Sequence, residues 1–176
     1  MDFVAEMRKT YWCAVPHTWY TSWVWLVSGL IGDMVSKPMA IVFFLVGCTL
    51  IFPIGEWIRK VLGGTGKASE GNTLPQLFVQ LAFTIPMGYP LVYLACRANI
   101  HYFFPAFTVL VGAHYLPFVY GYGKKTFGLL AVLLVGTGTL CIFYLNQSFS
   151  ISAYITAGWL ALFGTLHYYQ LKKETA

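Results

Sequence analysis

Runs of about twenty consecutive, mostly apolar residues recur along this chain, and this repetition limits the folds open to it. A helix of about 20 apolar residues crosses a bilayer hydrocarbon core about 30 Å thick. The chain has 176 residues, of which 58% are hydrophobic and only 10% charged, whereas a soluble domain is about 25% charged. Because so few charges cannot cover a soluble surface, the sequence predicts an all-α integral membrane protein.

We expect residues 1–176 to form a single transmembrane domain, a bundle of six membrane-spanning helices. The expected spans are Trp19–Val35, Met39–Ile58, Leu77–Cys96, Tyr102–Tyr122, Phe127–Leu145 and Ile151–Tyr169. One longer polar loop, Gly63–Thr73, separates the first two spans from the last four. Residues 1–16 are expected to form a short amphipathic helix that lies along the membrane surface and stops at Pro16.

The basic residues predict the orientation of this bundle. With six spans, nine Lys and Arg residues fall on the side of both termini: Arg8, Lys9, Arg59, Lys60, Lys67, Lys124, Lys125, Lys172 and Lys173. The opposite side holds only Lys37 and Arg97. Because basic residues near span ends concentrate on the cytoplasmic face, we expect both termini in the cytoplasm and the chain in the inner (cytoplasmic) membrane. The net charge of +5 therefore reflects topology and does not indicate nucleic-acid binding.

Prolines interrupt the second, third and fourth expected spans. The prolines expected to break these helices are Pro53, Pro86, Pro90 and Pro117. A proline leaves the carbonyl four residues earlier without its helical donor, and the carbonyls concerned are those of Thr49, Ala82, Pro86 and Ala113. Two interpretations stay open, since broken helices line cavities in transporters but prolines also shape helix packing.

The last two spans carry small residues instead of prolines. Ala153, Ala157, Ala161 and Thr165 recur every four residues in the sixth span, and the fifth contains Gly136 and Gly138. Small side chains let two helix backbones approach closely. This face predicts either packing within the bundle or a contact between copies in a homo-oligomer.

The candidate binding residues lie in the inner half of the expected membrane. His114 falls near the middle of the fourth span, and an embedded histidine can change charge near physiological pH. Glu56 is the one acid well within a span, and it either turns inward or pairs with Arg59 and Lys60. Gln80 belongs to a polar stripe on the third span that we expect to face protein or water.

Three further polar residues complete the set of substrate- or proton-binding candidates, namely Thr49, Tyr115 and His167. No metal-ligand spacing, phosphate-binding loop or catalytic motif occurs in the sequence, and the four cysteines have no paired spacing. We therefore expect no metal and no cofactor. Partners other than the lipid bilayer, an unidentified small molecule and a second copy of the chain are not indicated.

Three motifs, "IFPIGEW" (Ile51–Trp57), "FFP" (Phe103–Pro105) and "GAHYLPF" (Gly112–Phe118), resemble those of a family of small six-span bacterial membrane proteins of unknown function. The resemblance covers most of the chain. It implies an inner-membrane setting and a role for these motifs, and it implies no activity.

The leading hypothesis is a small transporter or channel-like protein for a solute or protons, with a polar site between the second, third and fourth spans. In this hypothesis His114 binds the ligand or proton, Glu56 is its acidic partner and Gln80 is a polar contact. The alternatives are a non-catalytic assembly or sensor subunit, and a membrane enzyme that acts on a lipid-soluble substrate. An enzyme is disfavoured because no nucleophile or metal motif accompanies His114 and Glu56.

Overall fold

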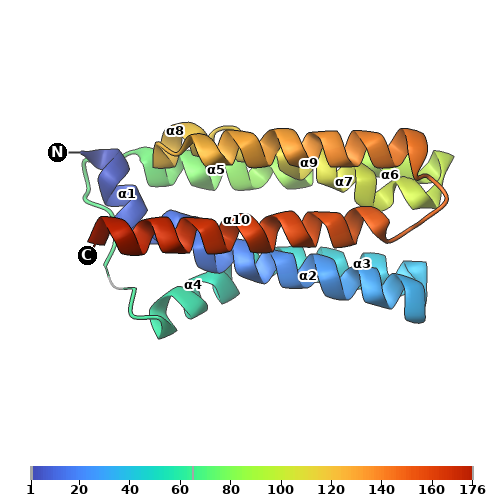
Figure 1. Cartoon of the computed structure of the whole chain (residues 1–176), viewed down its shortest axis with the longest axis horizontal. Coiled ribbons are helices and arrows are strands. Elements are labelled where there is room, and N and C mark those ends of the chain that lie inside the picture. The colour runs from blue at the N-terminus through green and yellow to red at the C-terminus, as the bar shows by residue number, and fades with distance from the viewer. Residues whose placement is uncertain (1, 65, 176) are drawn as a thin grey trace.

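The computed structural model describes residues 2–64 and 66–175, and these residues form helices and no strands. The helices are α1 (Phe3–Tyr11), α2 (Val15–Met34), α3 (Lys37–Thr49), α4 (Ile51–Val61), α5 (Leu74–Met87), α6 (Tyr89–Ala98), α7 (Phe103–Tyr115), α8 (Phe118–Tyr122), α9 (Lys125–Tyr144) and α10 (Ile151–Thr175), with the short turns η1 (Trp12–Ala14) and η2 (Ile100–Tyr102). The long helices run side by side, and both termini lie at the same end of the bundle (Figure 1). The all-α prediction is therefore confirmed.

The prediction of six spans is not confirmed by helix length and composition. Among the described residues, two helical segments are long and apolar enough to cross a membrane, Leu74–Ala98 and Lys125–Tyr144. The bent pair α3 and α4 makes a third if it counts as one span. Helices α2 and α10 have the length but mix apolar residues with many polar and aromatic ones, while α7 has only 13 residues.

The helix breaks fall close to the predicted prolines. Helices α3 and α4 meet at Leu50 with a bend of 56°, three residues before Pro53. Pro86 lies inside the end of α5, and Pro90 lies in the first turn of α6. Pro117 caps α8. These prolines do divide the predicted spans into shorter helices.

The carbonyl of Ala113 was predicted to lack a hydrogen-bond donor, but it has one. The backbone N–H of Leu116 donates to it at 3.2 Å. The chain tightens into a turn with a hydrogen bond between residues three apart, which is a common way for a helix end to satisfy its carbonyls.

The N-terminal helix is shorter than predicted. Helix α1 ends at Tyr11, because Trp12, Cys13 and Ala14 have left-handed backbones with φ of 52°, 50° and 56°. For residues with a side chain this conformation costs about 1–2 kcal/mol each. Pro16 lies in the first turn of α2, where its fixed φ is favourable, so it starts a helix and does not stop one. The left-handed turn lets α1 pack across the bundle end, against α5 and α8.

Aromatic side chains from α2, α3 and α7 form the centre of the core. The ring of Phe44 packs against those of Trp25, Phe103, Phe104 and Phe107, with centroids 4.7–5.6 Å apart. All five side chains are buried. Edge-to-face pairs at such distances add about 0.5–1.5 kcal/mol each beyond the burial of apolar area.

Close backbone contacts hold α7 against α9. A Cβ atom on Gly138 would lie 2.5 Å from the carbonyl oxygen of Pro105, and one on Gly112 would lie 2.9 Å from the backbone nitrogen of Val135. Buried hydroxyls then join α7 to α10, because the Thr108 hydroxyl lies 2.9 Å from that of Ser152. In contrast, no residue of α5, a helix that is described in full, is buried. The molecule thus has one tightly packed side and one loose side.

Candidate functional site

A cavity of about 610 Å³ lies between α2, α3, α4, α5 and α7, and Met7 and Tyr11 of α1 close one end of it. Most of its lining is aromatic or aliphatic, including Trp25, Phe78 and Phe107. Small-molecule sites in proteins typically have volumes of about 300–1,000 Å³ and apolar walls with a few polar groups. The size and lining of this cavity match that description.

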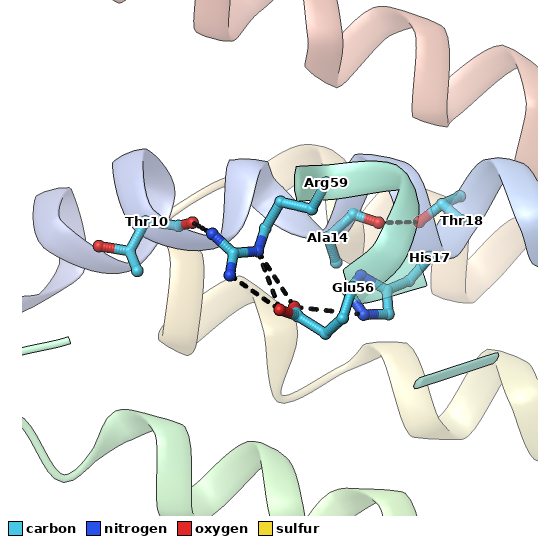
Figure 2. A network of polar contacts seen from close by, with 6 residues as sticks. All are labelled: Thr10, Ala14, His17, Thr18, Glu56 and Arg59. Carbon is cyan, nitrogen blue, oxygen red and sulfur yellow. Dashed lines mark hydrogen bonds and ion pairs between the residues drawn. The ribbon is translucent and has the colours of Figure 1, made fainter. Parts of the chain in front are cut away.

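Glu56 of α4 lines the cavity, and its carboxylate lies between the side chains of Arg59 and His17 (Figure 2). Its Oε2 accepts hydrogen bonds from Nε and Nη2 of Arg59 at 3.0 and 2.8 Å. Nη1 of Arg59 donates to the carbonyl of Thr10 at 3.2 Å, so the guanidinium also ties α4 to the end of α1. Although it is charged, Arg59 is only 5% exposed. A buried guanidinium needs such a carboxylate, because an unpaired buried charge is strongly unfavourable.

The imidazole of His17 lies on the other side of this carboxylate, as Figure 2 shows. Its Nε2 is 3.7 Å from Oε1 of Glu56. Gly55 makes room for the ring, since a Cβ atom at this position would lie 2.3 Å from Cδ2 of His17. The sequence Gly55–Glu56 therefore places the carboxylate beside the imidazole.

His114 of α7 lines the cavity wall at the break between α7 and α8. Its Nδ1 is 3.1 Å from the hydroxyl of Thr84, and that hydroxyl donates its hydrogen to the carbonyl of Leu81 at 2.6 Å. Because the hydroxyl has one hydrogen, we assign the proton of the neutral imidazole to Nδ1, which donates to Thr84. The other nitrogen, Nε2, is then a hydrogen-bond acceptor.

The rim of the cavity is largely apolar and lies between α4 and α5, beside the exposed Thr49 at the end of α3. Phe52 of α4 and Val79 and Phe83 of α5 all line the cavity, and they are 52%, 57% and 59% exposed. Residues that line a cavity and are also largely exposed mark its opening. The opening is therefore on the side of the bundle, and most of its edge consists of apolar side chains.

The structure brings together some of the candidates from sequence and separates others. Thr49, Glu56, His114 and Tyr115 all line the cavity. Gln80 is exposed and is absent from the cavity lining, whereas Thr84, one turn further along α5, contacts His114.

His167 lies apart from the cavity, in the interface of α9 and α10. Its Nε2 is 2.7 Å from the hydroxyl of Thr126, and its ring packs against Phe127. Glu56 and His114 are not paired with each other as expected from sequence, since Glu56 contacts His17 and Arg59. His114 contacts Thr84 instead.

Sequence reasoning missed His17 as a site residue. A signal was present, because His17 lies just before the first expected span and Glu56 lies just before the end of the second. Two antiparallel helices joined by a short turn bring these positions to the same depth.

The described residues offer no cluster of metal ligands, and the thiol of Cys13 in the turn before α2 is unreactive. Among the described residues no group of three or more His, Cys, Asp or Glu side chains is suited to hold a metal ion. All four cysteines are free. Burial raises the pKa of Cys13 to about 12, so its thiol stays protonated near neutral pH and is a poor nucleophile.

No curated protein and no solved structure matches the chain. One family model matches residues 3–170, which is nearly the whole chain. This match agrees with the resemblance to a family without a known activity, and it carries no information about a membrane. The chain belongs to the family described as "Family of unknown function (DUF7010)".

Proposed function

We propose that this chain is a six-span integral membrane protein with both termini in the cytoplasm, and that it is a proton-linked carrier for a small molecule that binds in the cavity. The observation that carries the proposal is the placement of His114 and the His17–Glu56 pair in the wall of an otherwise apolar cavity. Ionisable groups are costly inside a membrane and are typical of substrate and proton pathways.

The exposed surface supports the membrane setting. Large apolar side chains that are more than half exposed extend along α5, α6 and α9, namely Val79, Phe83, Leu91, Leu94, Val132 and Phe143. Apolar surface of this extent is rare on soluble monomers. The helix ends and loops that carry nine of the basic residues lie at the end of the bundle where the termini lie (Figure 1), as expected for a cytoplasmic face.

The broken helices support the proposal that this protein is a carrier. The interruptions at Leu50, Gly88 and Leu116 all belong to helices that line the cavity. Discontinuous helices around a central site are typical of secondary transporters, in which one part of the bundle moves against another. Here α4 and the loosely packed α5 flank the opening, while α7, α9 and α10 form the tight part.

Proton flux into vesicles tests the carrier. The purified protein is reconstituted into lipid vesicles that contain the pH indicator pyranine, and an inward proton gradient is imposed. We expect acidification to be several-fold faster than in protein-free vesicles, because the proposed pathway lets protons cross the cavity without a bound ligand. Ala82→Phe, which adds a ring inside the cavity, should bring the rate close to that of protein-free vesicles, whereas Ala98→Phe at the exposed end of α6 should leave it unchanged.

Equal rates in wild-type and protein-free vesicles would contradict the carrier. Equal effects of Ala82→Phe and Ala98→Phe would contradict the assignment of the pathway to the cavity. Circular dichroism and size-exclusion profiles identify a variant that has merely failed to fold.

A further inference from the structure

We infer that the ligand of this cavity is an uncharged, lipid-soluble molecule with a hydroxyl head, an alcohol or a phenol, that reaches the cavity from the bilayer between α4 and α5. The inference rests on the proposed function, because it takes the cavity as the binding site. Three features of the cavity carry it: the route of access, the hydrogen-bonding groups and the charge.

The route of access selects for a lipid-soluble molecule. The opening is edged by Phe52, Val79 and Phe83, all more than half exposed. A strongly hydrated solute would lose its water against these side chains and gain no hydrogen bond in return. For a molecule already dissolved in lipid, passage across this rim costs little.

Two imidazole nitrogens in the cavity wall are available as acceptors. His114 donates through Nδ1, which lies 3.1 Å from the hydroxyl of Thr84, so its Nε2 carries a lone pair. His17 turns Nε2 toward Glu56, so with the proton on Nε2 its Nδ1 also carries a lone pair. This Nδ1 is buried and has no hydrogen-bond partner among the described residues. A ligand that satisfies either nitrogen must therefore donate a hydrogen bond.

The charge of the cavity disfavours an ion. The carboxylate of Glu56 is already paired with the guanidinium of Arg59, whose Nη2 lies 2.8 Å from Oε2. With His17 and His114 neutral, the charges facing the cavity sum to zero. A cationic amine would have to displace Arg59 from its carboxylate, and an anion would have to displace Glu56 from Arg59. An uncharged hydroxyl donates without disturbing this pair.

A series of compounds with one apolar body and different heads tests the inference. Farnesol, farnesyl methyl ether, farnesylamine and farnesoic acid are bound to the full-length protein in micelles, and occupancy is measured by native mass spectrometry. We expect farnesol to bind about tenfold more tightly than the ether, since one hydrogen bond between uncharged groups is worth up to about tenfold in affinity. The amine and the acid should bind more weakly than farnesol.

Three variants test which residue causes the preference for farnesol over its methyl ether. His114→Phe keeps an apolar ring but removes the acceptor, so farnesol and its ether should then bind within about twofold of each other. Ala82→Phe should weaken all four compounds by filling the cavity. Ala98→Phe, outside the cavity, should change none of them.

The outcomes separate this inference from the carrier. If the ether or the amine binds as tightly as farnesol to the wild-type protein, the inferred ligand class is wrong, whatever the His114 variant does. If no compound binds while proton flux is present, the ligand class is wrong and the carrier stands. If farnesol is preferred but vesicles show no flux, the ligand class stands and the carrier is wrong.

Discussion

Glu6 holds the N-terminal helix against the loop between α4 and α5. Its carboxylate accepts hydrogen bonds from the backbone N–H of Ser69 at 2.7 Å, the Ser69 hydroxyl at 3.1 Å and the side-chain amide of Asn72 at 2.7 Å. Asn72 in turn accepts from the N–H of Leu74 at 3.0 Å and so orders the start of α5. One carboxylate thus links α1, the loop and α5 at the end of the bundle that we assign to the cytoplasm.

This contact predicts a pH dependence of the loop. The hydrogen bonds from Asn72 and from the backbone and hydroxyl of Ser69 lower the pKa of Glu6 below its ordinary value of 4.5. A lowered pKa means that the carboxylate stabilises the folded state fully above pH 4.5 and loses this effect as the pH falls through the lowered value. Amide hydrogen exchange of residues 66–74, corrected for intrinsic rates, should show several-fold lower protection in acid than at pH 7.

Glu6→Gln is the matched variant for this measurement. Its loop should be less protected than that of the wild type at pH 7 and should show little further change in acid. Wild-type protection that stays constant across the range would contradict the role of the carboxylate.

For single residues, the sequence predicted which polar side chains line the cavity better than it predicted which side chains they contact. Glu56, Thr49, Tyr115 and His114 were identified because polar groups in apolar runs are costly and need a reason. Arg59 was one of the partners offered for Glu56, because the two residues are one helix turn apart. His17 was missed, because it contacts Glu56 across a helix crossing whose rotation no residue pattern specifies. The position of Gln80 outside the cavity lining could not be predicted either, since the exposed face of α5 depends on how that helix packs.

Among the helices, the contact between α7 and α9 depends on one glycine and not on its neighbour. A Cβ atom on Gly138 would meet the backbone of Pro105 and Val109, whereas one on Gly136 has nothing within 4 Å. Gly138→Leu should therefore destabilise the fold by about 1–3 kcal/mol, as expected of overpacking. Gly136→Leu should be tolerated, because leucine favours a helix more than glycine does. Thermal unfolding of the two variants in detergent measures the difference.

Gly138→Leu and Gly136→Leu also test the predicted homo-oligomer. Part of the small-residue face of α10 is used within the chain, since Ala153 and Ala157 are buried, while Ala161 and Thr165 are exposed. If copies associate through Gly136, light scattering should show a smaller assembly for Gly136→Leu with an unchanged melting temperature. Equal destabilisation by the two leucines would contradict the contact geometry of α7 and α9.

The sequence predicted where the helical segments lie, but it did not predict where every break between them falls. Apolar runs and prolines predict where α9, α10 and the breaks near Pro53, Pro86 and Pro117 fall, because these are local effects of composition and of the missing N–H. The left-handed turn before Pro16 was missed, since Trp12, Cys13 and Ala14 carry no local preference for that conformation. It is imposed by the packing of α1 across the end of the bundle.

The whole molecule is asymmetric, with one tightly packed side and one loosely packed side. Close glycine contacts and shared hydroxyls join α7, α9 and α10, and the cavity opens where α4 bends away from α3 by 56°. The alternation of basic residues predicted that both termini lie at one end, and they do (Figure 1). A cavity is a property of how helices are spaced, so composition and prolines could suggest it without giving its position or lining.

Photolabelling from within the bilayer tests most directly whether this cavity opens to lipid. The protein in lipid vesicles is irradiated with a lipid-soluble aryl diazirine, and the modified residues are mapped by mass spectrometry. We expect adducts at the rim, on Phe52 and Phe83, and also inside, on Phe107 and Tyr115, although both interior residues are buried. With Ala82→Phe the interior adducts should disappear and those at the rim should remain. Adducts confined to the rim and other outward-facing residues of the wild-type protein, with none on Phe107 or Tyr115, would contradict the account.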